Sequence, residues 1–410
     1  MAVTSAARVA ERDARAGAVL IGFADALAAP EVAWSLIDAG HQVVAFARRG
    51  SWTALRHCRG ATIIEVTAPE QDAEAAVTDL LGVLGRGEFE GLMPLDDAAV
   101  MLCDRAVQRG AQIAVVGPTG EQARLALDKS LQVAAAIRAG FDVPPTRVVQ
   151  SADEVLGLEQ LPVILKAAQV VAVHDGSLVR GSGHVCGNRA ELEVAVRRWG
   201  GRGPLLAQPL ITGVGEGLFG IASAAGITAL SAHRRIRMAN PQGSGSSACE
   251  TATVDPELAR CAEAMLTEIG WTGMFMLEFL RDRDGTAWFM ELNGRPWGSM
   301  ALARRAGLEY PAWAVRQTSD PGFEPAPVAV PEGQVCRHLG REIVHLLFVL
   351  RGPKSVALVE WPSRRRALRD VLTVHRGQGW YNLRPRERRL FVEDTIRTVV
   401  SQVAKKRARA

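Results

Sequence analysis

Three polar side chains, spaced two residues apart, stand at the end of an apolar run. They are Glu291, Asn293 and Arg295, in the stretch Phe-Met-Glu-Leu-Asn-Gly-Arg-Pro-Trp-Gly-Ser of residues 289–299. On a β-strand, residues two apart project from the same face. A carboxylate, an amide oxygen and a guanidinium on one face suit a hard cation with a phosphate group beside it.

A second apolar run, residues 274–280, comes just before the first, and Asp284-Gly285 lies between them. Asp-Gly between two strand-like runs predicts a β-hairpin. With these two residues as its loop, Glu278 lies directly opposite Glu291, and two facing carboxylates repel each other. A bound Mg²⁺ would turn the repulsion into ligation, with Asn293 as a further oxygen ligand. The alternative is a sheet face on which both carboxylates point into water; the apolar flanks favour the metal site.

The elements that must position these residues begin with residues 18–117, where short apolar runs alternate with helical patterns. This alternation predicts a parallel βαβ sheet with strands at 18–23, 42–47, 62–66, 91–95 and 113–117. The first strand is followed by Gly-Phe-Ala-Asp instead of G-x-G-x-x-G, so a Rossmann-like fold here does not imply NAD. Asp96 and Asp97 follow a strand, where such sheets bind ligands; capping of the next helix is the favoured alternative.

From residue 118 the pattern becomes α+β. Lys129 opens a helix, Lys166 ends an apolar strand, and His174-Asp175-Gly176 predicts a second hairpin. The later segments are a Gly-rich turn at 180–183, a strand at 205–210, a mobile connection at 211–217, a flexible polar loop at 241–247, a proline-rich linker at 319–334 and a mainly helical region at 335–410. Ser299 is expected to cap a helix rather than to contact a substrate.

The composition, 48% hydrophobic and 22% charged over 410 residues, predicts two or three domains of an ordinary globular protein. No apolar run approaches the roughly 18 residues that span a bilayer. Residues 1–15 lack an apolar segment and predict a loose tail instead of a signal peptide. The six cysteines are scattered without a CxxC motif, which is typical of a reducing compartment. We therefore expect a cytoplasmic protein without membrane insertion.

Basic residues are concentrated at the C-terminal end. Residues 351–410 hold sixteen Lys and Arg against five Asp and Glu, whereas residues 1–350 hold thirty-two against thirty-nine. Such an excess could recruit nucleic acid or a membrane surface. The arginines are spread among Leu, Val and Trp, so helices packed on the body with a basic outer face are the favoured interpretation.

The order of these features resembles the ATP-grasp superfamily, most closely ligases similar to the large subunit of carbamoyl phosphate synthetase. The most similar segment is 289–306 (FMELNGRPWGSMALARRA), with Glu278 ahead of it and Lys129 and Lys166 further upstream. The resemblance implies an ATP-grasp fold of mixed α/β and α+β parts. Its expected divisions are a Rossmann-like pre-ATP-grasp domain (1–117), a small lid subdomain (118–203), a large subdomain with the metal site (204–320), and a linker with a basic helical extension (321–410).

The resemblance also implies a role for each matching residue. The phosphates of ATP would be contacted by Lys129, Lys166 and the turn Gly181-Ser182-Gly183. The adenine edge would be held by Gln208, Pro209 and Leu210, and the ribose by Glu216. Two Mg²⁺ ions, with Mn²⁺ as a substitute, would be held by Glu278, Glu291 and Asn293, and Arg295 would stabilise the transferred phosphate. Many relatives carry a long Gly-rich phosphate loop, whereas this chain has the predicted hairpin within 170–185. The resemblance therefore leaves open how the lid covers the phosphates.

The implied reaction joins a small carboxylic or amino acid to an amine. The carboxylate attacks the γ-phosphorus of ATP, which gives an acylphosphate and ADP, and the amine then attacks the acyl carbon. Alternation along a basic strand places His233, Arg235 and Arg237 on one face, where the two arginines would bind the carboxylate and the leaving phosphate. Ser246, Ser247 and Glu250 come from the loop beside them. The alternative for this strand is a solvated basic edge.

The expected partners are therefore small carboxylate and amine substrates, without nucleic acid, and the superfamily suggests a homodimer. Two other functions stay open. One is a non-catalytic ATP-binding module whose basic tail recruits a partner or nucleic acid. The other is an NAD-linked enzyme, which lacks its fingerprint.

Overall fold

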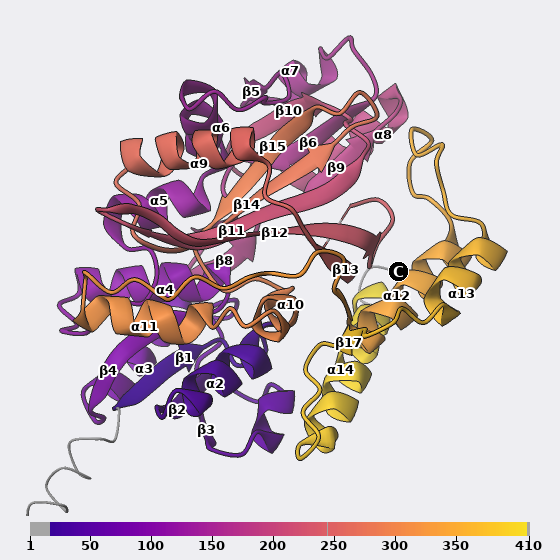
Figure 1. The fold of residues 1–410 in the computed structure, drawn as a ribbon. Coiled ribbons are helices and arrows are strands. Elements are labelled where there is room, and N and C mark those ends of the chain that lie inside the picture. The colour runs from indigo at the N-terminus through magenta and orange to yellow at the C-terminus, as the bar shows by residue number, and fades with distance from the viewer. Residues whose placement is uncertain (1–16, 244, 408–410) are drawn as a thin grey trace, which may run out of the picture.

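A four-stranded parallel sheet in the order β3-β2-β1-β4 forms the first part of the computed structural model (Figure 1). The structure describes residues 17–243 and 245–407, so the predicted tail of residues 1–15 lies outside it. The elements are β1 (Ala18–Gly22), α2 (Ala29–Asp38), β2 (Gln42–Arg48), η1 (Ala54–His57), β3 (Ala61–Val66), α3 (Ala73–Leu84), β4 (Phe89–Pro94) and α4 (Asp97–Gln108). The expectation of a strand at 113–117 was wrong: only Val115 forms a bridge, to Leu92, and the chain then turns at Gly117-Pro118, where proline cannot donate to a ladder.

An antiparallel sheet in the order β5-β10-β6-β9 follows, and it forms the part expected to be the lid. Its strands are β5 (Arg147–Val149), β6 (Val163–Ala167), β9 (Gly183–Cys186) and β10 (Leu205–Pro209). The accompanying helices are α5 (Gly120–Leu127), α6 (Lys129–Arg138), α7 (Ala152–Leu156) and α8 (Arg189–Trp199). Alternate residues of β6, Val163 and Leu165, pack with α8 in a small core of this sheet.

The hairpin of β7 (Val171–His174) and β8 (Ser177–Arg180) has the predicted two-residue loop, with Asp175 and Gly176 both at positive φ (49° and 78°). It does not join the lid sheet. Gly176 O accepts a hydrogen bond from Ala73 N (2.8 Å), and Leu178 lies in the core of the first domain. The hairpin therefore attaches the lid to the N-terminal sheet.

A seven-stranded sheet in the order β15-β14-β11-β12-β13-β16-β17 forms the large subdomain. Its strands are β11 (Val214–Ser223), β12 (Gly226–Met238), β13 (Ser246–Ala252), β14 (Gly273–Arg281), β15 (Ala287–Asn293), β16 (Val335–Arg337) and β17 (Gly379–Trp380). The helices are α9 (Pro256–Glu268), α10 (Met300–Arg305) and α11 (Tyr310–Ser319). Ser246 and Ser247 thus begin a strand instead of lying in the expected loop, because their backbone pairs with β12.

The two faces of this sheet have separate cores. Phe275 and Leu277 pack with α6 and α9 on one face. Met274 and Met276, which alternate with them, share the other core with residues of β1 and α2 of the N-terminal domain. The large sheet and the first domain are therefore joined by continuous apolar packing, seen as adjacent layers in Figure 1.

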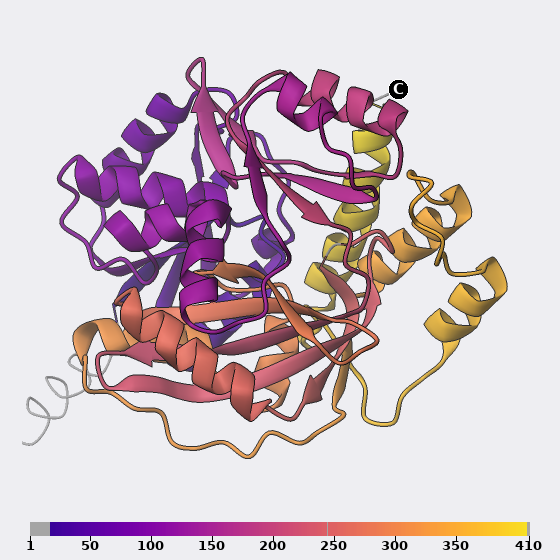
Figure 2. The same cartoon turned by 90° about the horizontal axis from the view of Figure 1, so that it is seen from above.

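The C-terminal extension is α12 (Leu339–Arg351), α13 (Arg364–Leu372) and α14 (Arg388–Arg407), and Figure 2 shows it along the side of the molecule. It is helical as expected, but β16 and β17 also add two strands to the large sheet. The N-terminal domain holds α14: Trp34 Nε1 donates to Glu387 (2.9 Å), and Arg397 pairs with Asp25 (2.8 Å). Within the described residues, no helix has the length and apolar character needed to cross a membrane.

The segment between α12 and α13 contacts both the lid and the large subdomain. At one end, Glu191 of α8 accepts hydrogen bonds from Ser355 Oγ (2.6 Å) and Val356 N (3.0 Å). At the other end, Glu360 pairs with Arg283 in the β14–β15 loop. This bridging segment, residues 355–360, therefore connects the lid with the large sheet.

Candidate active site

The β14–β15 hairpin brings the two predicted carboxylates together. Glu278 is paired directly with Glu291, as predicted. The loop itself was predicted wrongly: it spans five residues, 282–286, with Arg281 opposite Ala287. A β-bulge between Glu278 and Phe279 shifts the register by one residue and restores the Glu278–Glu291 pair.

The bulge decides which face Glu291 occupies. Phe289 and Leu292 both pack in the core beside α6 and α9, although three positions separate them. Simple alternation from Phe289 would send Glu291 into that core. Because Met290 is the extra residue, Glu291 lies on the opposite face, and Met290 Sδ is 3.9 Å from Lys166 Nζ.

Cations neutralise both carboxylates. Lys129 forms an ion pair with Glu291, and Arg235 pairs with Glu278 at 2.5 Å. Burial alone would raise the pKa of Glu291, but Lys129, Asn293 and Arg295 together outweigh burial and hold the pKa well below its usual range. Glu291 likewise raises the pKa of Lys129 against the effect of burial. Both residues are therefore charged at neutral pH.

The oxygen ligands present fit a hard divalent cation. Asn293 donates from Nδ2 to Glu291 Oε1 (3.1 Å), so its amide lies beside the carboxylate pair. No cluster of three or more His, Cys, Asp or Glu that could hold a metal occurs in residues 17–243 and 245–407. Two glutamates and an amide leave coordination positions for phosphate oxygens and water, as Mg²⁺ sites usually do.

Lys166 lies on the same side of the site, but its pKa is shifted in the opposite direction from that of Lys129. Burial and the neighbouring Lys129 lower the pKa of Lys166 to about 8, although Glu291 and Glu278 act in the opposite direction. Lys129 begins α6, where Asp128 caps the helix and Lys129 N donates to Ala168 O (2.8 Å). The two lysines therefore come from a helix start and a strand end, as predicted.

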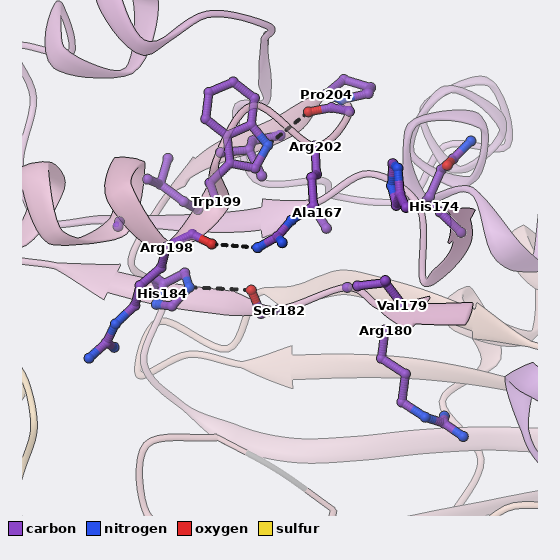
Figure 3. Close-up of a pocket in the computed structure, with 17 residues that line it drawn as sticks. Ala167, His174, Val179, Arg180, Ser182, His184, Arg198, Trp199, Arg202 and Pro204 are labelled. Carbon is purple, nitrogen blue, oxygen red and sulfur yellow. Dashed lines mark hydrogen bonds between the residues drawn. The ribbon is translucent and has the colours of Figure 1, made fainter. Parts of the chain in front are cut away.

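The Gly181-Ser182-Gly183 turn links β8 to β9. Gly181 has no room for a side chain, because a Cβ there would lie 2.4 Å from Gln169 O. Ser182 Oγ is 3.3 Å from His184 Nε2, and both line a pocket of about 70 Å³ with Trp199 (Figure 3). That pocket is on the Leu165 face of β6, opposite Lys166, so it is separate from the carboxylate pair.

The predicted nucleotide-edge residues lie at the end of β10. Gln208 is buried and donates to Thr146 Oγ1 (2.8 Å), Pro209 ends the strand, and Leu210 N donates to Pro162 O (3.3 Å). Glu216 of β11 accepts from Arg281 Nε (2.9 Å).

A small cavity of about 50 Å³ adjoins the carboxylate pair. Its polar lining includes His233, Arg235, Ser246, Glu278, Ser299 and Arg341. His233 is 3% exposed; its Nδ1 contacts Ser299 Oγ (3.1 Å), and its Nε2 has no partner in the described part of the chain. Burial lowers the pKa of His233 to about 3, so the ring is neutral. Ser299 therefore contacts His233 and makes no side-chain cap, contrary to expectation.

Arg341 of α12 was missed by the sequence analysis. Its Nη1 donates to Ser246 O (3.1 Å), and no ion pair involving Arg341 occurs among residues 17–243 and 245–407. Burial lowers its pKa. A partly buried guanidinium that lacks a carboxylate partner favours an anionic ligand in the adjoining cavity. The sequence carried no signal for this residue, since no local pattern distinguishes it from the other arginines of residues 335–410.

Other predicted site residues have different partners in this structure. Arg295 pairs with Asp97 of the first domain (2.7 Å), and Arg237 is buried against Glu342 (3.0 Å). Ser247 is buried and donates to Arg237 O (3.3 Å), whereas Glu250 pairs with Arg234 (2.6 Å).

Asp96, for which helix capping was favoured, does cap α4, by accepting from Ala99 N (2.8 Å). It also pairs with Arg180 of the β7–β8 hairpin (2.8 Å). The roles predicted for the site residues in binding or catalysis stay predictions.

Comparisons with known proteins agree with this architecture. Residues 226–341 match a family model described as "ATP-grasp in the biosynthetic pathway with Ter operon". L-amino acid ligase from Bacillus licheniformis aligns over 75% of this chain and 74% of its own, with 16% identity and a TM-score of 0.58. The biotin carboxylase domain of 2-oxoglutarate carboxylase from Hydrogenobacter thermophilus, in complex with MgADP, aligns over 78% and 73%, with 18% identity and a TM-score of 0.60.

N5-carboxyaminoimidazole synthetase from Staphylococcus aureus, in complex with ADP, aligns over 78% of this chain and 80% of its own, with 16% identity and a TM-score of 0.59. No curated protein sequence matches the chain. The chain has the ATP-grasp fold, with a Rossmann-like N-terminal part, and its residues 226–341 match an ATP-grasp family model. The subgroup of carbamoyl phosphate synthetase stays a prediction.

Proposed function

We propose that the chain is an ATP-dependent ligase that activates a small carboxylic or amino acid as an acylphosphate and joins it to an amine. The observation that carries this proposal is the paired Glu278 and Glu291, with Lys129, Lys166 and Arg235 around them. Two carboxylates and three cations on one surface match the needs of a metal-bound triphosphate. A binding protein that only held a nucleotide would not need both carboxylates positioned.

Glu278, Glu291 and Asn293 would hold Mg²⁺, two ions in our proposal, with Mn²⁺ as a substitute. The metal would neutralise phosphate charge as it develops during transfer. Lys129 and Lys166 would bind phosphate oxygens, and Arg235 would exchange Glu278 for an anionic group of the substrates. Arg295 would stabilise the transferred phosphate once it leaves Asp97. ATP would lie between the lid and the large sheet, with its adenine near Gln208, Pro209 and Leu210.

The small cavity would hold the carboxylate that is activated. Arg341 supplies a cation without a carboxylate partner, and the neutral His233 supplies Nε2. The carboxylate oxygen attacks the γ-phosphorus and ADP leaves with the electron pair of the broken P–O bond. No nucleophile of the chain is required, and burial raises the pKa of the cavity cysteine, Cys249, to about 11.

Exchange of Glu291 for Gln tests the proposal. We expect Glu291→Gln to lower turnover by at least about 100-fold, because a metal ligand and the partner of Lys129 are both lost. ADP release is measured with pairs of amino acids or small carboxylic acids and amines, with mass detection of any amide product. Glu257→Gln makes the same chemical change on the exposed face of α9 and should leave turnover unchanged.

Full activity of Glu291→Gln, with unchanged circular dichroism, would contradict the metal assignment. Nucleotide binding without ADP release for every substrate pair would instead favour a non-catalytic ATP-binding module. The mass of the assembled protein in solution would test the homodimer that we propose from the superfamily.

A further inference from the structure

A groove of about 880 Å³ separates the end of the large sheet from the C-terminal extension. Gly213, Gly215 and Arg237 line its sheet side, and Trp361, Arg366 and His375 line its extension side. The extension lies beside this edge of the sheet in both views (Figures 1 and 2). The groove is therefore a feature that this chain builds with its own extension.

The groove leads to the proposed reaction centre. Arg235 lines both the groove and the small cavity, and its guanidinium pairs with Glu278 (2.5 Å). A ligand lying in the groove with one end at Arg235 would therefore place that end beside the carboxylate pair.

The walls of the groove carry excess positive charge. Four arginines line it, Arg235, Arg237, Arg283 and Arg366, against two acids, Glu360 and Asp370. Glu360 pairs with Arg283, and Asp370 pairs with Arg366 (3.6 Å). Because Glu278 pairs with Arg235 (2.5 Å), the excess charge comes from Arg237. Cations around a groove attract ligands of opposite charge.

The charge of Arg237 is not cancelled beneath the wall. Arg237 and Arg337 share the single carboxylate of Glu342, at 3.0 and 2.9 Å, and all three side chains are at most 8% exposed. Two guanidiniums on one carboxylate leave a net positive charge that solvent screens poorly. This triad adds to the field in the groove and favours an anion there.

The size of the groove exceeds what a single amino acid needs. Pockets of roughly 300–1,000 Å³ enclose drug-sized molecules, and this groove lies in that range. Trp361, Pro241 and Pro362 give it flat apolar surface beside the charges. Its size and lining suit an extended ligand that has a chain-like backbone and carboxylate side chains.

We propose that the groove binds the amine substrate, and that this substrate is an acidic peptide with a free N-terminus. This rests on the proposed ligase function. The peptide nitrogen would form the amide bond to the acyl carbon while the carbon–oxygen bond to phosphate breaks. Phosphate leaves with the electron pair, and the protons of the nitrogen pass to phosphate and solvent. The peptide carboxylates would replace Glu360 and Asp370 as the partners of Arg283 and Arg366.

The test is direct binding in the absence of ATP. Isothermal titration with tri-glutamate, compared with the neutral tri-glutamine of equal length, should show about tenfold tighter binding of tri-glutamate, which corresponds to one or two charge-assisted contacts. The double variant Arg283→Gln/Arg366→Gln should abolish most of this preference. Arg369→Gln is the matched control, because Arg369 is on the same helix with 75% exposure, against 72% for Arg366, and does not line the groove.

Equal binding of the two peptides, no binding of either, or equal loss in Arg369→Gln would overturn the proposal. Tighter binding of an oligonucleotide with three phosphates would also overturn it and assign the groove to nucleic acid. The binding result is independent of turnover. If tri-glutamate binds as expected but no substrate pair releases ADP, the peptide site is supported and the ligase function is contradicted. If small amines support ADP release but no peptide binds, the ligase function is supported and the peptide site is contradicted.

Discussion

At the scale of single residues, Lys129 and Lys166 show how position sets charge around one carboxylate. Lys129 touches Glu291, and this contact raises its pKa despite burial. Lys166 touches Met290 Sδ instead, so burial and the charge of Lys129 lower its pKa to about 8. The two residues would share one task, binding phosphate, but only Lys166 titrates in an accessible range.

The titration of Lys166 predicts a pH dependence of nucleotide binding. Lys166 is charged below its pKa of about 8 and becomes neutral as the pH rises through this value. We therefore expect the affinity for a non-hydrolysable ATP analogue to fall about tenfold between pH 7 and pH 9.5, the worth of one charged hydrogen bond. Calorimetry over this range measures it. Lys166→Arg stays charged and should flatten the curve; a drop of equal size in that variant would assign the titration to another group.

Residue types and spacing predicted part of this site. Glu278 and Glu291 could be paired from the sequence because a hairpin is a local structure. Arg341 could not be found, since its contact with Ser246 depends on how α12 packs against β13. The pairing of Arg295 with Asp97 could not be predicted either, because it joins two domains whose relative orientation no local sequence pattern encodes.

At the scale of elements, the β14–β15 hairpin shows a correct conclusion reached through an incorrect loop. The Asp-Gly signal predicts a two-residue loop, yet Asp282 accepts hydrogen bonds from Asp284 N and Thr286 N and stabilises a five-residue loop. The bulge at Met290 then compensates for the changed register. A bulge has no reliable mark in a single sequence, because it is stabilised by packing on both sides of the strand.

The lid turn gives a prediction at the scale of elements. Gly181→Ala places a Cβ 2.4 Å from the backbone oxygen of Gln169 and 2.9 Å from the Cβ of Ala167, and neither neighbour can rotate away. We expect a loss of about 1–3 kcal/mol in the free energy of unfolding. Urea titration measures it. Gly183→Ala is the matched control, since its Cβ would find only Leu165 O at 3.8 Å; equal destabilisation by both changes would show that close packing is not the cause.

At the scale of the whole molecule, the extension is a structural part of the protein. The sequence indicated helices with a basic outer face, and α14 does pack on η1 and α12. Acids in and just before α14 make long-range contacts beside that of Arg397: Glu387 accepts from Trp34, and Glu393 accepts from Trp52 (2.9 Å). Charge counting along the sequence could not identify these contacts, because they depend on which face of α14 meets the N-terminal domain.

Removal of α14 should therefore destabilise the entire chain. A chain that stops after residue 383 loses buried Leu390 and the acceptors of two tryptophans. About 1–3 kcal/mol for the orphaned donor of the buried Trp34 and about 2 kcal/mol for the leucine are a large fraction of the stability of a typical domain. We expect a fall of more than about 10 °C in the melting temperature, followed by circular dichroism. Arg389→Ala, at an exposed position of α14, should change it little, and an unchanged melting temperature of the truncated chain would refute this role.

The bridging segment 355–360 has a consequence for the order of events. Because Ser355 and Val356 hold the lid helix α8 through Glu191, and Glu360 holds the β14–β15 loop, the lid and one wall of the groove share a mechanical connection. Any ligand that shifts the lid also shifts that wall. Thermodynamic linkage is reciprocal, so the factor by which nucleotide changes affinity in the groove equals the factor by which an occupied groove changes affinity for nucleotide. The two substrates would then communicate through a segment that lines the groove and holds the lid only through Glu191.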